Sequence, residues 1–157
     1  QKDGTITAAN ASAISDGAAA LVLSTAEAAE HDGHTPIARI VGHAGFAGEP
    51  SWFTTAPVGA IKNLLQKTGW SIKDVDLFEV NEAFAVVTMA AMKELDIPHE
   101  KINVNGGACA LGHPIGASGA RIIVTLIHAL KARGLKKGVA AICLGGGEAT
   151  AIALEVI

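Results

Sequence analysis

The chain has 157 residues, of which 50% are hydrophobic and 17% are charged, so it can bury a sizeable core and is not a disordered tail. Its formal net charge of -3 comes from 12 basic and 15 acidic residues without a block of like charge, which argues against a nucleic-acid partner. Two cysteines are too few for a disulfide-stapled secreted domain, and no apolar run approaches the roughly 18 residues of a membrane span, so we predict a cytoplasmic location and no membrane partner.

The N-terminal third of the chain predicts two strands around one short helix. Residues 1–7 carry neither an initiating methionine nor the basic and apolar regions of a signal peptide, so we expect the sequence to start within a longer chain. The apolar run of residues 18–24 favours a buried strand, and residues 37–41 favour another. Between them, Thr25 is placed to cap a short helix that ends near Gly33.

The middle of the chain predicts a helix, a strand and a second helix. Pro57 stands in the first turn of a helix whose apolar residues recur with the 3.6-residue period until Gly69 ends it. Residues 77–80 form a short apolar run that is typical of a buried strand. Asn81 follows as a candidate helix cap, and the next helix has one apolar face. That face contains Phe84, Val87, Ala91 and Leu95.

The C-terminal part of the chain predicts a third helix followed by a hairpin. The helix begins near Ala117 and ends before Gly134, with basic residues in its last turn that suit the negative end of the helix dipole. Residues 139–144 and 149–156 are strand-like, and the glycines between them indicate a tight antiparallel connection. Because strands alternate with helices and a hairpin closes the chain, we predict an α/β fold with a mixed sheet.

The glycine-rich segment 103–119 contains a single histidine, His113, shortly before the third predicted helix. The segment has neither a Walker loop, which needs a Lys followed by Ser or Thr, nor a dinucleotide fingerprint of the form G-x-G-x-x-G. One interpretation is that the glycines allow a tight loop around a structural histidine. The alternative is that His113 has a chemical role in a site beside this loop.

Two other residues capable of chemistry lie at the ends of predicted strands. Asn81 comes directly after residues 77–80, and Cys143 precedes the glycine hairpin. Active sites of α/β proteins form at strand ends, so these residues and His113 are candidates for one site. Alternatively, Asn81 caps a helix and Cys143 is a small core residue. Cys109 has small apolar neighbours and is expected to be structural, and a zinc site from both cysteines and His113 lacks a fourth ligand, so we predict no metal.

Ordered motifs make this sequence similar to a known family. They are NEAFA at residues 81–85, GGACALGHPIGASGAR at residues 106–121 and CLGGG at residues 143–147, with GTITAANASAISDGAAA at residues 4–20. Together they resemble the C-terminal portion of a thiolase of the acetyl-CoA acetyltransferase type. The resemblance implies that residues 25–157 form a C-terminal half with a five-stranded mixed sheet covered by helices. Residues 1–24 would then be the end of a loop insertion and the last strand of the N-terminal half.

The same resemblance implies a reversible Claisen condensation of two acetyl-CoA molecules to acetoacetyl-CoA and CoA. The family's nucleophilic cysteine would lie in the N-terminal half, outside these residues. His113 would activate that nucleophile and help to stabilise a thioester oxyanion, and Asn81 would hold a water in the same oxyanion site. Cys143 would act as the acid and base for the methyl proton, and the backbone N–H of Gly145 would complete a second oxyanion hole.

The resemblance also implies a CoA-binding channel. Ser12, Ala83 and Phe84 would line the pantetheine channel, although each of them is equally well explained as an ordinary structural residue. Ala13 and Ser15 stand where glycine and asparagine are frequent in the family, which affects the packing of the pantetheine. The implied partners are acetyl-CoA, acetoacetyl-CoA, CoA, the N-terminal half of the same enzyme and further copies in a homo-oligomer. CoA would be a substrate or product, with no further cofactor.

Two alternatives use the same fold. A ketosynthase-like condensing enzyme commonly has a histidine where Cys143 stands, so the cysteine argues against it. A non-catalytic acyl-CoA or lipid-binding module would be favoured by loss of Asn81, His113 or Cys143, and all three are present. We therefore predict an acyltransferase. Residues 1–157 alone cannot complete its reaction, because the nucleophile lies elsewhere.

Overall fold

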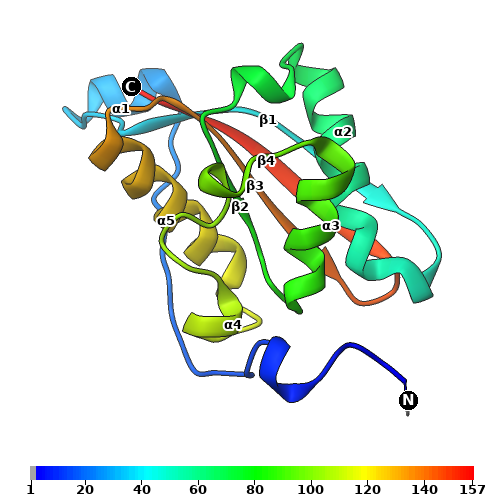
Figure 1. Cartoon of the computed structure of the whole chain (residues 1–157). Helices are drawn as coiled ribbons and strands as arrows, with labels where there is room; N and C mark the ends of the chain where they lie inside the picture. Colours follow the sequence, from blue (N-terminus) through cyan, green and yellow to red (C-terminus); the bar gives the residue numbers. More distant parts are fainter. Residues whose placement is uncertain (1–2) are drawn as a thin grey trace.

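The computed structural model describes residues 3–157 and centres on a mixed sheet of four strands in the order β1-β4-β3-β2 (Figure 1). The strands are β1 (Ala38–Ala47), β2 (Leu77–Val80), β3 (Lys137–Leu144) and β4 (Glu148–Val156). β4 is antiparallel to both β1 and β3, whereas β2 runs parallel to β3. The predicted α/β class, the strand at residues 77–80 and the closing hairpin are therefore confirmed.

The sheet has four strands and not the expected five, and beside β2 the chain forms only a single further bridge. Ile102 forms a parallel bridge with Phe78, and the backbone N–H of Asn103 donates to the Phe78 carbonyl at 2.9 Å. Pairing stops there because Asn103 has a φ of 47°, a left-handed conformation that turns the chain away from the strand direction. The Asn103 side chain then bonds to the N–H and the carbonyl of Val80, each at 2.8 Å. The prediction of five strands is wrong, because the Asn103 side chain makes the hydrogen bonds to Val80 that the backbone of a further strand would make.

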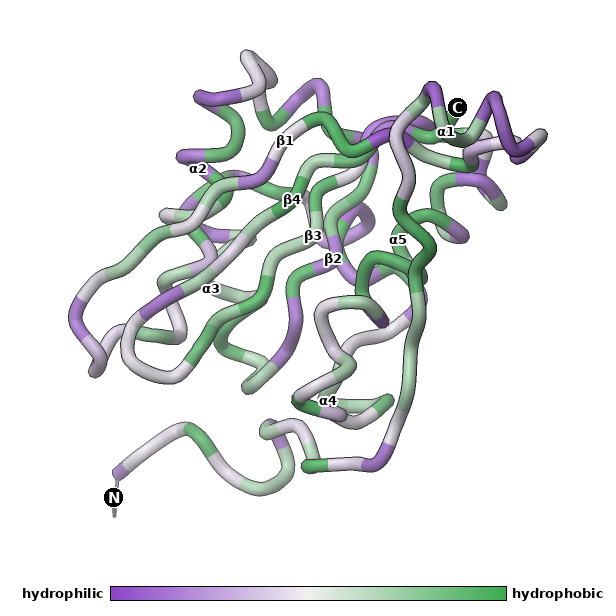
Figure 2. Tube along the Cα trace, turned by 180° about the vertical axis from the view of Figure 1, so that it is seen from behind, coloured by the Kyte–Doolittle hydropathy of each residue, from purple (hydrophilic) through white to green (hydrophobic). Residues whose placement is uncertain are grey.

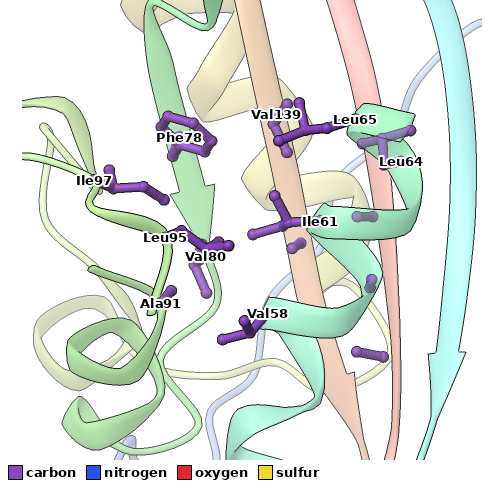
Figure 3. Packing of buried hydrophobic residues seen from close by; sticks show 14 of the residues in the cluster. Val58, Ile61, Leu64, Leu65, Phe78, Val80, Ala91, Leu95, Ile97 and Val139 are labelled. Atoms are coloured by element: carbon purple, nitrogen blue, oxygen red, sulfur yellow. The ribbon is translucent and has the colours of Figure 1, made fainter. Parts of the chain in front are cut away.

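One face of the sheet is covered by α2 (Ala56–Thr68) and α3 (Ala85–Leu95). α2 follows the predicted pattern, since Pro57 lies in its first turn and Gly69 ends it with a φ of 71°, a left-handed value that glycine adopts without strain. Figure 3 shows the resulting core, in which side chains from these helices meet those of β2 and β3. Its members include Ile61, Leu64, Phe78, Leu95 and Val139.

The opposite face is covered by α5 (Ser118–Arg133), so the helices lie on both sides of the sheet (Figure 1). The helix ends at Gly134 with a φ of 66°, as its sequence signals predicted. Alternate residues of β2 contribute to the two layers, because Phe78 and Val80 belong to the α2 and α3 core and Leu77 belongs to the α5 core. The other buried members of the α5 core include Ile122, Leu126, Leu130, Ala140 and Leu154.

Short elements complete the chain. α1 (Ala26–His31) begins where predicted, because the Thr25 hydroxyl accepts a hydrogen bond from the Ala28 N–H at 3.2 Å. α4 (Ala108–Leu111) is a single turn within the glycine-rich segment. Further 3-10 turns lie at Ala8–Asn10, Pro50–Thr55, Ile72–Asp74 and His99–Lys101. Among residues 3–157, every helix is too short or too polar to cross a membrane.

Residues 18–24 do not form the predicted buried strand. The segment is extended without a strand partner in the described chain, and Figure 2 shows it as a largely hydrophobic stretch that leads to α1 along the outside of the molecule. Val22 is 97% exposed and Leu23 is 73% exposed. An extended segment becomes a strand only where a neighbour takes its backbone hydrogen bonds. The resemblance places such neighbours in the other half of the fold, and residues 3–157 do not supply them.

Residues 1–157 on their own should self-associate. Several large apolar side chains have more than half of their surface exposed, and such surface favours association in water. They include Ile14, Val22, Leu23, Trp52, Met89 and Ile115. We expect sedimentation at micromolar concentration to show oligomers or aggregates, and we expect less association when Val22 and Leu23 are both changed to Asp. A stable monomer that unfolds cooperatively would contradict this expectation and favour the non-catalytic binding module.

Candidate active site

Asn81 and Cys143 lie at the same edge of the sheet, at the ends of two adjacent strands. β2 and β3 are parallel, and the backbone N–H of Asn81 extends their pairing by donating to the Ala141 carbonyl at 2.9 Å. Cys143 lies two residues farther along β3 than Ala141, and both candidates are buried, with exposures of 1% for Asn81 and 9% for Cys143. This edge holds the carboxyl ends of the parallel strands, where sites of α/β proteins are usually built.

The helix-cap interpretation of Asn81 is wrong. α3 begins at Ala85, its N-cap residue is Phe84, and no side chain caps it. The Asn81 side chain instead contacts α5, where Arg121 Nη2 donates to Asn81 Oδ1 at 3.5 Å. Asn81 Nδ2 is buried and has no hydrogen-bond partner among residues 3–157. An unpaired buried donor opposes folding, so its presence favours a role in binding an acceptor.

The N-terminal segment connects His113 to the end of β2. Ser12 donates to the Ala83 carbonyl through its backbone N–H, at 3.1 Å, and through its hydroxyl, at 3.0 Å. The next residue, Ala13, accepts a hydrogen bond from the His113 N–H at 2.8 Å. In Figure 1 this part of the chain passes beside α4. Adjacent residues of one segment thus contact both the loop after β2 and the loop that carries His113.

Ser118 determines which nitrogen of the His113 ring carries the proton. Ser118 is fully buried, and its hydroxyl donates to the Pro114 carbonyl at 3.1 Å. With its one hydrogen directed to Pro114, Ser118 Oγ accepts in its 2.6 Å hydrogen bond with His113 Nδ1. The proton of neutral His113 is therefore on Nδ1, and the lone pair of Nε2 is available to accept a proton.

Burial shifts the pKa of both ionisable candidates, His113 and Cys143. It lowers the pKa of His113, and the positive charge of Arg121 lowers this pKa further. Burial raises the pKa of the Cys143 thiol, and a backbone hydrogen bond opposes this rise. At neutral pH, His113 is thus a neutral base and Cys143 is a protonated thiol.

Gly145 lies in the turn between β3 and β4 and has open space around it. A Cβ atom added to Gly145 would meet no heavy atom within 4 Å. The turn itself requires glycine at the next two positions, where Gly146 and Gly147 have φ values of 96° and 89°. The fold therefore does not need glycine at Gly145, whose missing side chain leaves the backbone open to a bound group.

Ala83 and Phe84 lie beside the N-terminal segment that contains Ser12. Phe84 forms an isolated bridge with Ala11, and its ring packs edge-on against Phe53 at a centroid distance of 6.1 Å. Together with the hydrogen bonds between Ser12 and Ala83, these contacts bring the three expected channel residues into one place. Their role in binding pantetheine stays a prediction.

Cys109 has structural contacts near this site. Its backbone N–H donates to Glu82 at 3.0 Å, and its thiol donates to the Asn10 carbonyl at 3.6 Å. Burial raises the pKa of the Cys109 thiol, and the Glu82 carboxylate raises it further, so the thiol stays protonated. Within residues 3–157, no three His, Cys, Asp or Glu side chains gather in a way that could hold a metal ion.

Three neighbours of the candidate residues were missed by the sequence patterns. Ser118 and Arg121 belong to the motif at residues 106–121, but only the fold shows that they contact His113 and Asn81. Glu79 interrupts the apolar strand before Asn81, and a carboxylate in a buried strand was the signal that could have identified it. Glu79 Oε2 lies 3.6 Å from Arg121 Nη1.

Comparison with known proteins finds relatives along the chain. The family model described as "Thiolase, C-terminal domain" matches residues 34–156, and "Thiolase, N-terminal domain" matches residues 1–27. The chain is 51% identical over 155 residues to an acetyl-CoA acetyltransferase of Chromobacterium violaceum, a match that covers 99% of this chain and 40% of the relative. The chain thus spans about 40% of the length of the curated relatives that it matches.

Solved structures share this fold. The crystal structure of the Bacillus anthracis acetyl-CoA acetyltransferase matches with a TM-score of 0.97 at 50% sequence identity, covering 100% of this chain and 40% of that chain. The human mitochondrial 3-ketoacyl-CoA thiolase in complex with CoA matches with a TM-score of 0.93 at 43% identity, again over 100% of this chain and 40% of that chain.

Proposed function

Because this chain belongs to the thiolase family, as its motifs predicted, we propose that it is the C-terminal portion of an acetyl-CoA C-acetyltransferase. The whole enzyme condenses two acetyl-CoA molecules to acetoacetyl-CoA and CoA, and it catalyses the reverse thiolysis. The names of relatives at 50% and 51% identity support this reaction, and the CoA complex of the human thiolase supports a CoA substrate. The observation that carries the proposal is a neutral His113 with an available Nε2, on a loop that the segment of Ser12 and Ala13 joins to the loop after β2.

In the first half of the reaction, a cysteine of the N-terminal half attacks the thioester carbon of acetyl-CoA. His113 Nε2 takes the proton of that cysteine, and Cys143 protonates the departing CoA thiolate. Asn81 Nδ2 donates, through a water, to the thioester oxygen as it gains charge, and a donor of this kind is worth roughly 3–4 kcal/mol in the transition state. The products are CoA and an acetyl thioester on the nucleophilic cysteine.

In the second half, Cys143 is a thiolate and removes a proton from the methyl group of a second acetyl-CoA. The carbanion attacks the acetyl thioester, so that a C–C bond forms and the bond to the nucleophilic sulfur breaks. The Gly145 backbone N–H stabilises an oxyanion in this half, and the open space around Gly145 supports that role. The nucleophilic thiolate regains its proton from His113, which restores the starting state.

Thiolysis by the full-length protein is the test of this proposal. A full-length thiolase that carries residues 1–157 should convert acetoacetyl-CoA and CoA to acetyl-CoA, which chromatography detects directly. Binding of CoA without any turnover of acetoacetyl-CoA would contradict the proposal and favour the non-catalytic acyl-CoA-binding module.

We also propose that the whole enzyme is a cytoplasmic homotetramer, and the exposed apolar side chains of this chain support burial against further chains.

Residues 1–157 alone should show neither thiolysis nor an acetyl-enzyme, because the nucleophile of the first half-reaction is not among them. Both cysteines of the chain are protonated thiols whose pKa values are raised by burial, which makes them poor nucleophiles. Intact-mass spectrometry after incubation with acetyl-CoA measures this, with the full-length enzyme as the positive control. A stoichiometric acetyl adduct on Cys143 would overturn its assignment as an acid and base.

A further inference from the structure

A buried polar cluster between β2 and α5 contains two charged residues, Glu79 and Arg121, that have no part in the reaction steps above. It consists of Glu79 on β2, Asn81 directly after this strand, and Arg121 on α5. Glu79 and Asn81 are each 1% exposed, and the Arg121 side chain is 19% exposed. Alternate residues of an extended chain share a face, so Glu79 and Asn81 both lie on the face covered by α5. The neighbouring contacts of that face are hydrophobic, which makes a cluster of charges there unusual.

Arg121 contacts both other members of the cluster. Its Nη2 atom donates to Asn81 Oδ1 at 3.5 Å, and its Nη1 atom lies 3.6 Å from Glu79 Oε2. A guanidinium group has donors only, so the end of the Asn81 amide that faces Arg121 must be the oxygen. The N–H2 group of Asn81 is thereby the end left without a partner among residues 3–157. The contact thus makes the N–H2 group the end of the amide that is available to a water or a bound group.

The cluster is poorly built for stability alone. Glu79 Oε1, Arg121 Nε and Arg121 Nη1 are all buried without a hydrogen-bond partner in residues 3–157. A buried ion pair stabilises a fold only when its geometry is good and its remaining polar atoms are satisfied, and apolar side chains of similar size often serve as well or better. A role in the site accounts for the charges better than a role in packing.

We propose that Arg121, held by Glu79, is a positioning residue that fixes the Asn81 amide with its N–H2 group toward the reacting thioester. This inference rests on the proposed function and deepens it, because Asn81 is the donor of the first half-reaction. Arg121 also acts on the base of that step, since its positive charge adds to burial in lowering the pKa of His113. One guanidinium group thus supports both the donor and the base.

Two substitutions of Arg121 in the full-length enzyme separate its contact from its charge. For Arg121→Met we expect kcat of thiolysis to fall about 10- to 100-fold, with little change in KM for CoA. The acidic limb of the pH profile should also move to higher pH, because His113 loses a nearby positive charge. Arg121→Lys keeps that charge, so the limb should stay in place while kcat still falls. Arg133→Met is the matched control and should keep full activity, since Arg133 lies on the same helix and its Nη2 atom donates to another asparagine, Asn105, at 3.2 Å.

A double-mutant cycle tests whether Arg121 acts through Asn81. Measured above the acidic limb, Arg121→Met should cause almost no further loss of kcat in an Asn81→Ala background, because the amide that it orients is already absent. Equal losses in the two backgrounds would overturn the inference, since a purely structural arginine gives additive effects. Unchanged activity of Arg121→Met in the native background would overturn it as well.

Crystal structures provide a readout that does not depend on activity. In Arg121→Met we expect the Asn81 amide to rotate or to lose its single orientation, as judged from its hydrogen-bond partners. An Asn81 amide that keeps a single orientation with its N–H2 group on the same side would overturn the inference. Absence of thiolase activity in the unmodified full-length protein would instead overturn the proposed function, and the orientation of Asn81 would still decide the role of Arg121.

Discussion

Replacing Cys143 by alanine in a full-length thiolase that carries these residues should abolish condensation while acetylation of the nucleophilic cysteine persists. Cys143 is buried at the end of β3, and its proposed task is to take and return the methyl proton of acetyl-CoA. Exchange of the acetyl methyl protons with solvent should therefore disappear. Acetylation persists because His113 still activates the nucleophile and because CoA is able to leave as a thiolate.

His113→Ala should give the opposite pattern, with acetylation itself impaired. The available Nε2 lone pair of His113 is the group that takes the proton of the nucleophile, and Ser118 holds the ring in the required tautomer. Loss of a general base lowers the rate roughly 100- to 10,000-fold, which is far above the error of the assay. Removal of His113 therefore blocks the first half-reaction, and removal of Cys143 blocks the second.

The two half-reactions are measured side by side. Quenched mass spectrometry follows the burst of acetyl-enzyme, and NMR follows the uptake of deuterium into the methyl group of acetyl-CoA. Cys109→Ala is the matched cysteine control, because the Cys109 thiol bonds to the Asn10 carbonyl and has no proposed role in the reaction. If Cys143→Ala lost the burst as completely as His113→Ala while it remained folded and bound CoA, both residues would belong to activation of the nucleophile.

The helices could be predicted from the sequence because their signals are local. The 3.6-residue period of α2 and α5 lies within each segment, and the residues that end them, Gly69 and Gly134, adopt the left-handed conformation that glycine alone adopts without strain. The hairpin of β3 and β4 was equally local, since its glycines form the turn between two apolar runs. These elements need no distant partner to be recognised.

The two errors in the sheet concern pairing, which a single segment does not determine. Residues 18–24 have the composition of a strand, but extended backbone pairs only when a neighbour is present. A fifth strand does not form beside β2, because the left-handed backbone of Asn103 and its side-chain bonds to Val80 replace a ladder. The left-handed conformation of Asn103 is visible in the structure, but helix and strand propensities do not predict it.

Only the placement of candidate residues at the strand ends was predictable from the sequence. Strand ends gave the positions of Asn81 and Cys143, because the end of an apolar run is visible in the sequence. The neighbours that set their chemistry come from α5, and Ser118 and Arg121 are carried to the site by the packing of that helix on the sheet. Contacts of this kind depend on the relative placement of two elements, which no local pattern encodes.

The free energy of unfolding should fall with rising pH because of Glu79. Burial raises the pKa of Glu79 from its ordinary value of 4.5 to about 7, against the attraction of Arg121 from α5 and with a further rise from Glu82 in the loop after β2. At pH values between 4.5 and about 7, Glu79 is protonated in the folded protein and ionised in the unfolded chain. The resulting stability is fully present below the unfolded pKa and is lost as the pH rises through the folded pKa, a change of about 3 kcal/mol.

Glu79→Gln should remove this part of the pH dependence, because the amide keeps the shape of the side chain and does not titrate. Between pH 5 and pH 8 we expect the urea midpoint of full-length Glu79→Gln to fall less than that of the unmodified protein, at one fixed protein concentration. Glu100→Gln removes an exposed carboxylate and should follow the unmodified protein. Parallel profiles for the unmodified protein and Glu79→Gln would mean that Glu79 is already ionised at pH 5 in the folded protein, and that it forms a charged pair with Arg121 over the whole range.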